Sequence, residues 1–248
     1  MKRLIAGTAL AATLAVAAAA TRPFWVAPDA AQAQAWLHAA ADGRDAQAEA
    51  SLARWSERGS VDARRAYADL LAHRSDAASR RRLEQVLGDA ADAGDAPAAA
   101  QLAELLARTQ AGLSKTGADD ARIARLLAQG AAGRVPAASR LLALRALDAT
   151  KGTPDLARAA TLMGQAADGG DAPAMFLYAN MLRAGQGVPR DDARALALYQ
   201  AAADVDYAPA LQALTIAYRY GELGLQADSS QSRLMDHEAA EALAHAAH

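Results

Sequence analysis

Hydrophobic and polar positions along the chain follow a helical spacing that is itself repeated about every 36 to 39 residues. Four prolines, each followed by alanine, mark this longer period, at Pro97, Pro136, Pro173 and Pro209. Four residues after each alanine stands a large apolar residue, followed by a mostly small one; the large residues are Leu102, Leu141, Tyr178 and Leu214. Residues four apart share one helix face, and a period of this length is typical of stacked helix pairs. The pattern predicts an all-α repeat array.

An earlier stretch matches the same pattern without its proline. Gly59 and Ala63 precede Tyr67 at the corresponding spacing. The prediction is therefore about five helix pairs, with repeats near 63–97, 98–136, 137–173, 174–209 and 210–248, preceded by a less regular but helical segment from about 30 to 58. The whole array is expected over 35–248.

Turn residues separate the predicted helices. Three residues before each proline, the chain has Gly94, Gly133, Gly170 or Asp206. Glycine readily adopts the left-handed conformation after a helix, and proline suits the first turn of the next one. Arg145 interrupts an otherwise apolar column, which predicts either a side chain that reaches out to solvent or a local irregularity of the third repeat.

The second helix of each predicted pair has its own signals. An aspartate is expected to cap the start, at Asp120, Asp155 or Asp191, because a carboxylate accepts hydrogen bonds from free N–H groups there. Seven residues before the turn position stands a large apolar residue expected in the core: Leu87, Leu126, Met163 or Tyr199.

Composition narrows the functional classes. Hydrophobic residues make up 53% of the chain but aromatic residues only 4%, which suits closely packed alanine-rich helices rather than strands. The net charge of −2, with both signs interspersed, argues against nucleic-acid binding. The absence of cysteine excludes disulfides and thiolate chemistry. No cofactor or metal is expected.

The N-terminus has the layout of an export signal. Lys2 and Arg3 precede an uncharged run from Leu4 to Ala20, which is short for a membrane span. Two interpretations stay open for residues 1–34: a cleaved signal peptide, or an uncleaved inner-membrane anchor with Phe24 and Trp25 at the interface, followed in either case by a short linker. Both place the remaining chain in the periplasm or outside the cell.

The stretch from Ala174 to Ala210 resembles a full Sel1-like repeat, a relative of the tetratricopeptide repeat. The matching positions are Ala174, Tyr178, Ala179, Leu182, Gly185, Gly187, Val188, Asp191, Ala195, Leu198, Tyr199, Ala202 and Ala203. The other repeats match less fully, mainly in the turn between their helices. The resemblance implies an α-solenoid, wound as a right-handed superhelix, with the first helix of each pair lining its inner face.

By analogy with that geometry, ten side chains are expected to form a partner-binding groove. They are Arg65, Asp69, Glu104, Arg108, Phe176, Asn180, Arg183, Gln212, Arg219 and Tyr220. Arginine and aromatic residues dominate the energetics of protein interfaces. The alternative for any one of them is an ordinary solvated helix face.

Catalytic signatures are missing from the sequence. The five histidines show no specific metal spacing, and no nucleophile elbow or phosphate loop is found. Carboxylate pairs such as Asp191 with Asp192 are explained by capping. The leading hypothesis is a non-enzymatic adaptor that binds another protein in the periplasm or envelope; the resemblance extends it to envelope or exopolysaccharide export assemblies. Alternatives are a protein that binds or acts on cell-wall glycan, for which Phe176 and Tyr220 would form a short aromatic row, and a secreted effector or immunity factor.

Overall fold

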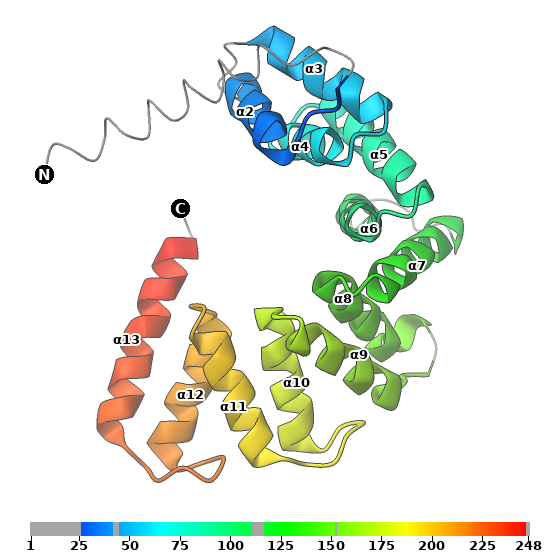
Figure 1. Ribbon diagram of the computed structural model, residues 1–248. Coiled ribbons are helices and arrows are strands. Elements are labelled where there is room, and N and C mark those ends of the chain that lie inside the picture. The colour runs from blue at the N-terminus through cyan, green and yellow to red at the C-terminus, as the bar shows by residue number, and fades with distance from the viewer. Residues whose placement is uncertain (1–25, 42–44, 111–116, 152, 247–248) are drawn as a thin grey trace, which may run out of the picture. The chain divides into compact units, whose positions relative to one another are not determined.

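The computed structural model describes residues 26–41, 45–110, 117–151 and 153–246, and within these ranges every regular element is a helix (Figure 1). The chain divides after residue 93 into two compact units, an N-terminal unit and a C-terminal unit. The predicted export signal, with Phe24 and Trp25, lies outside the described residues. In the part that is described, no helix has the length and apolar character needed to cross a membrane.

The described part of the N-terminal unit consists of four helices, of which each packs on the next along the chain and the first also packs on the third. They are α2 (Ala30–Ala41), α3 (Ala46–Glu57), α4 (Val61–Ala72) and α5 (Ala77–Asp92). The segment expected to be helical before the first repeat thus forms α2 and α3. Its core is built from small and aliphatic side chains, with Leu52, Ala63 and Leu71 almost completely buried.

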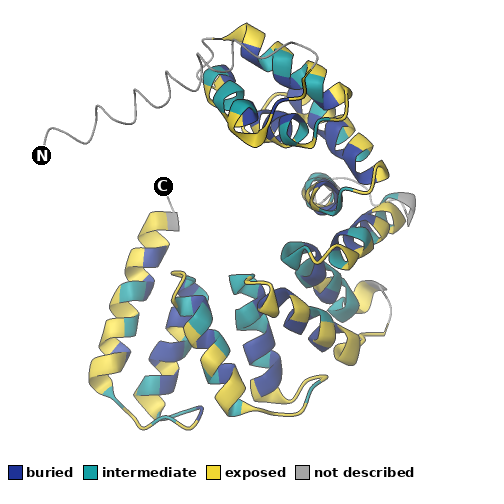
Figure 2. Cartoon of the chain, viewed as in Figure 1, coloured by how far each residue is buried: buried dark blue, intermediate teal, exposed yellow. Residues whose placement is uncertain are grey.

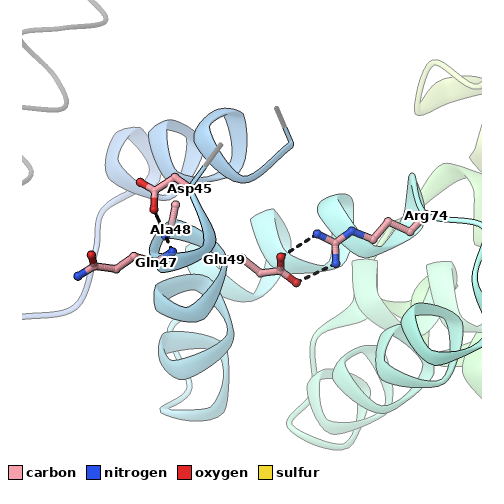
Figure 3. Close-up of polar contacts among 5 residues, drawn as sticks. All are labelled: Asp45, Gln47, Ala48, Glu49 and Arg74. Carbon is pink, nitrogen blue, oxygen red and sulfur yellow. Dashed lines mark hydrogen bonds and ion pairs between the residues drawn. The ribbon is translucent and has the colours of Figure 1, made fainter. Parts of the chain in front are cut away.

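Polar contacts fix the start of α3 and tie it to the loop after α4. The carboxylate of Asp45 accepts hydrogen bonds from the backbone N–H groups of Gln47 and Ala48. One turn into the helix, Glu49 accepts two hydrogen bonds from Arg74, both at 2.8 Å (Figure 3). This fork-to-fork geometry joins residues 25 positions apart in the sequence.

Among its described residues, the C-terminal unit contains eight α-helices and one short 3-10 turn, again with each α-helix packed on the next. The α-helices are α6 (Ala96–Gln110), α7 (Gly117–Ala132), α8 (Pro136–Leu147), α9 (Leu156–Asp168), α10 (Ala172–Ala184), α11 (Asp192–Ala203), α12 (Ala208–Tyr220) and α13 (Ser229–Ala246); the 3-10 turn η1 covers Ala149–Lys151. Together with α4 and α5, these helices form the five predicted pairs.

A continuous core runs from α8 to α12. It combines many alanines with a few large residues, among them Met163, Tyr178, Tyr199 and Leu214. Figure 2 shows the result: most helices of this unit have a buried stripe and an exposed one. The four apolar residues predicted for the second helices, including Leu87 and Leu126, are all buried, which confirms the core pattern.

The turn before α8 differs from the prediction by one residue. The left-handed position is taken by Gly94, Gly170 and Asp206 in the other repeats, but here by Arg134 with φ 59° rather than by Gly133. The cause is the proline: Pro136 is the first residue of α8, whereas Pro97, Pro173 and Pro209 are the second residues of their helices.

This shift moves the whole register of the third repeat. The fully buried small residues of α8 are Ala138 and Ala143, each one residue later than the pattern of the other repeats predicts: Ala137, which follows the proline, and Leu142, which follows Leu141. The column position assigned to Arg145 belongs to Ala146, which packs against the core. Arg145 instead donates two hydrogen bonds of 2.9 Å to Asp120. Neither an irregular helix nor a snorkelling side chain is needed to explain it.

Aspartate caps two of the three second helices as predicted. Asp155 accepts a hydrogen bond from the N–H of Arg158, and Asp191 accepts one from the N–H of Arg194. The prediction for Asp120 is wrong, because α7 already begins at Gly117 and Asp120 lies within its first turn. Its carboxylate binds Arg145 of the neighbouring helix.

Candidate functional site

The exposed side of α12 presents a helical row of three side chains spaced four residues apart, Gln212, Ile216 and Tyr220, which we call the α12 face. Ile216 is 45% exposed and Tyr220 is 68% exposed, the largest exposed fraction among the exposed large hydrophobic residues of the described chain. Residues four apart on a helix lie on one side of it, so these side chains form one surface. Two of the three, Gln212 and Tyr220, belong to the predicted groove.

Arg219 lies beside this row but is already engaged. Its guanidinium donates to Asp236 of α13 at 2.7 Å and to the hydroxyl of Ser232 at 3.3 Å. The side chain therefore ties α12 to α13. The side chain of Arg219 is half-exposed next to the α12 face, and Asp236 neutralises its positive charge.

Arg183 of α10 is bound in a similar way. It forms an ion pair of 3.1 Å with Glu222, which follows α12. The same guanidinium lies close enough to the Tyr199 hydroxyl to act on it, but burial is the larger effect and raises the pKa of Tyr199 above its ordinary value. Both groove arginines of the C-terminal unit's last two pairs are thus linked to acidic residues of the chain itself.

Asn180 and Phe176, the other predicted groove residues of α10, also have internal partners. The Tyr199 hydroxyl donates a hydrogen bond of 2.6 Å to the side-chain oxygen of Asn180. The ring of Phe176 is half-buried and lies 5.8 Å from the ring of Tyr199 and 5.9 Å from that of Tyr207. The aromatic row considered for glycan binding is therefore reduced to Tyr220 as its freely exposed member.

The remaining predicted residues lie on α4 and α6. On α6, Arg108 pairs with Glu104 one turn earlier at 2.7 Å. On α4, in the N-terminal unit, Arg65 and Asp69 are both solvent-exposed. Partial desolvation raises the pKa of Asp69, and its backbone oxygen contacts His73 Nδ1 at 2.7 Å.

Two exposed apolar residues at equivalent positions of their repeats were missed by the sequence analysis. Ile216 of α12 and Leu144 of α8 each stand eight residues after the start of their helix, and Leu144 is 38% exposed. In the other three repeats this position is polar, with Asp69, Glu104 and Asn180. The register shift at Pro136 hid Leu144, whereas Ile216 was detectable as an apolar residue on the polar side of its helix.

Four of the six charged residues of the predicted groove form ion pairs within the chain. The carboxylate pair at the start of α11 is engaged as well: Asp191 caps α11, and Asp192 pairs with Arg190 at 2.7 Å. Within the described ranges, no group of three or more histidine, aspartate or glutamate side chains is placed to hold a metal ion.

Comparison with solved structures identifies the fold. A Sel1 repeat protein from Oxalobacter formigenes has a TM-score of 0.74 and 20% sequence identity, with 90% of this chain and 91% of that chain covered. A protective antigen of uropathogenic Escherichia coli strains that displays an SLR fold has a TM-score of 0.66 and 19% identity; 85% of this chain matches 45% of the antigen. The chain matches no protein-family model and no curated protein sequence. The predicted Sel1-like, all-helical repeat fold is confirmed.

Proposed function

We propose that this chain is a non-enzymatic adaptor of the bacterial periplasm or cell envelope, which holds a partner protein on the α12 face. The observation that carries the proposal is the exposure of Ile216 and Tyr220 next to arginines that are already neutralised. Large apolar side chains presented together on a rigid surface are typical of protein interfaces, and tyrosine is enriched among the residues that contribute most to binding.

The partner surface that fits this face is itself apolar at its centre. Gln212 provides an amide for hydrogen bonding at one end of the row, and Tyr220 provides a ring and a hydroxyl at the other. Internal ion pairs hold Arg183 and Arg219, so a strongly acidic partner has no free arginine charge to meet there. An amphipathic helix or a short apolar loop of the partner has the required chemistry.

The decisive experiment is affinity purification of the intact chain from its native envelope, followed by comparison of variants. Ile216→Ala and Tyr220→Ala should each reduce recovery of the specific partner at least about tenfold, as expected for interface residues at the centre of a contact. Val205→Ala is the matched control, because Val205 is 61% exposed but lies in the loop before α12.

The result is interpretable only if the variants stay folded. Helical circular dichroism should be unchanged, since both side chains are exposed. Recovery of the same partner by the double variant Ile216→Ala/Tyr220→Ala, at the level of the parent chain, would exclude the α12 face as the binding surface.

The envelope location is a separate part of the proposal and depends on the basic and uncharged run at residues 2–20. Fusion of residues 1–40 to a reporter that is active only outside the cytoplasm should give activity, and deletion of residues 4–20 should abolish it. Cell fractionation then distinguishes the two open forms. A cleaved chain is recovered in the soluble periplasmic fraction, whereas an anchored chain stays with the inner membrane.

A further inference from the structure

A cavity of about 490 Å³ opens on the C-terminal unit, on residues other than those of the α12 face. It lies where the last turn of α7, the first turn of α8 and the last turn of α9 meet. The polar side chains of its lining are Arg134, Ser139, Gln165 and Asp168. The rest of the lining consists of the small residues Ala131, Ala132 and Gly169. The volume falls within the range of small-molecule sites, which is roughly 300 to 1,000 Å³.

Ser139 gives the first indication that the cavity takes a ligand. The residue is only 3% exposed, yet its hydroxyl forms no hydrogen bond with any described residue. Every fully shielded side-chain oxygen or nitrogen in the described ranges does have a partner. The Ser139 hydroxyl must therefore face the cavity, because it is neither shielded nor bonded. A hydroxyl without a partner in the wall of a cavity can form a hydrogen bond with a ligand that occupies the cavity.

Arg134 and Asp168 provide opposite charges in the same lining. Arg134 follows α7 in a left-handed turn, and Asp168 is the last residue of α9. Among the ion pairs of the described residues, none involves either side chain, although both line one cavity. Because this guanidinium and this carboxylate do not pair with each other, they can bind the two oppositely charged ends of one ligand.

Helix polarity adds to this separation of charge. The cavity receives the C-terminal ends of both α7 and α9, where the helix dipole places partial negative charge. These ends favour a cationic group near Asp168. The carboxylate of a ligand is then left to the guanidinium of Arg134, which offers several donors in a fixed plane.

Close backbone packing keeps the walls of the cavity in place. A Cβ atom added to Gly169 would lie 2.6 Å from Cγ of Pro136, and one added to Gly130 would lie 2.7 Å from the Cβ of Ala138. The end of α9 and the end of α7 are thus both pressed against the start of α8. A site held in this way loses little conformational freedom when a ligand binds.

We propose that this cavity binds a small zwitterion that carries both an ammonium and a carboxylate group, either a free α-amino acid or a short unblocked peptide. Arg134 binds the carboxylate, and Asp168 with the two helix ends binds the ammonium. Ser139 and Gln165 add hydrogen bonds. A sugar ring is a poor fit, because the lining contains no aromatic side chain on which it could stack.

The test is a titration of the full chain, followed by amide chemical shifts in the C-terminal unit. The probes are alanine and alanyl-alanine, which distinguish the two sources of the ligand, together with N-acetyl-alanine and alanine amide, which each lack one charge. At least one zwitterion should shift the amides of residues 131–139 and 165–169. Both single-charge probes should bind about tenfold more weakly or not at all.

Charge-neutral variants assign the two ends of the ligand. Arg134→Gln and Asp168→Asn should each weaken binding of the zwitterion about tenfold. The controls Arg158→Gln and Asp204→Asn change exposed residues that do not line the cavity, and they should leave binding unchanged. Helical circular dichroism establishes that all four variants are folded.

Three results would overturn the proposal. The first is no saturable shift with either zwitterion at millimolar concentration. The second is equal binding of the single-charge probes, and the third is equal weakening by the control variants. None of these results bears on the α12 face, because the envelope partner is tested with different variants.

Discussion

Gly187 is the residue at which turn conformation and helix packing are most tightly coupled. Its φ is +69°, and a Cβ atom there would lie 2.0 Å from the carbonyl oxygen of Leu156 at the start of α9. Gly185, two residues earlier, has a similar φ of +66°, but its nearest neighbours would be 3.7 Å away. The two glycines share one conformational requirement and differ in the space around them.

Gly187→Ala should therefore destabilise the C-terminal unit more than Gly185→Ala. The left-handed conformation costs an alanine about 1 to 2 kcal/mol at either position. At Gly187 the clash with backbone adds roughly 1 to 3 kcal/mol, because a carbonyl group of a packed helix cannot simply rotate away. Urea unfolding followed by circular dichroism measures both. Equal destabilisation would show that the contact with Leu156 is easily relieved.

The Glu49 and Arg74 pair makes the N-terminal unit sensitive to acid. Hydrogen bonding by Arg74 lowers the pKa of Glu49 below its ordinary value of 4.5, against the opposing effect of burial. A carboxyl group whose folded-state pKa is depressed stabilises the fold above the unfolded pKa, and this contribution disappears as pH falls through the folded value. Both side chains are about one-third exposed, so the contribution is about 0.5 to 1 kcal/mol.

Arg74→Gln should accordingly lower the free energy of unfolding of the N-terminal unit by about that amount at pH 7. The difference from the parent chain should shrink once the pH falls below 4.5. Tryptophan fluorescence is a suitable signal, because all three tryptophans, Trp25, Trp36 and Trp55, lie before residue 93. Arg80→Gln, an exposed change on α5, is the control. A loss that is the same at every pH would contradict an ionic origin.

At the scale of the helix, capping and ion pairing combine at the start of α10. Asp171 accepts a hydrogen bond of 2.9 Å from the N–H of Ala174, and both of its oxygens accept from Nε of Arg140 in α8. The side chains are only 9% and 21% exposed, respectively. The side chain of Asp155 caps α9 in the same way, but it has no second hydrogen-bonding partner among the described residues.

Asp171→Ala should destabilise the C-terminal unit by roughly 2 to 4 kcal/mol, whereas Asp155→Ala should cost about 1 kcal/mol. Both lose a cap, but only the first leaves a largely buried guanidinium without its carboxylate. Asp171→Asn separates the two effects, since asparagine retains the cap. Thermal and urea unfolding measure the series. If Asp171→Ala and Asp155→Ala were equivalent, Arg140 would not depend on this carboxylate.

Helix number and type were predictable from the sequence because they depend on local spacing. Alanine content, apolar residues four apart and the recurring proline all act within one or two helical turns. The register of α8 was not predictable in this way. Proline is tolerated at either of the first two positions of a helix, so Pro136 alone does not decide where α8 begins.

The candidate site was harder to predict for a different reason. The position of Arg183 and Arg219 on their helices followed from repeat spacing. Their partners, Glu222 and Asp236, lie on elements that meet only in the folded unit. Charge alone thus overstated how much of the surface is free for a partner. The exposed Ile216 is a better guide, because an apolar residue on the solvent side of a helix has no structural role to explain it.

At the scale of the whole molecule, the core that runs from α8 to α12 joins these five helices of the C-terminal unit. Residues of all five helices belong to the same buried cluster, with Met163 of α9 fully buried near its centre. In repeat proteins each helix pair depends on its neighbours, so local loss of packing is passed along the array. A single core substitution should then destabilise the neighbouring helices as well as its own.

Met163→Ala should destabilise the C-terminal unit by about 2 to 5 kcal/mol, the usual range for a large-to-small change in a core. Hydrogen exchange of peptides from α8, α9, α10, α11 and α12 should accelerate together, because these helices open as one unit. Leu156→Ala on the same helix is the control, since Leu156 is 43% exposed and should change exchange little. Acceleration confined to α9 would mean that each pair opens independently. The α12 face would then lack the rigid support that a docking surface requires.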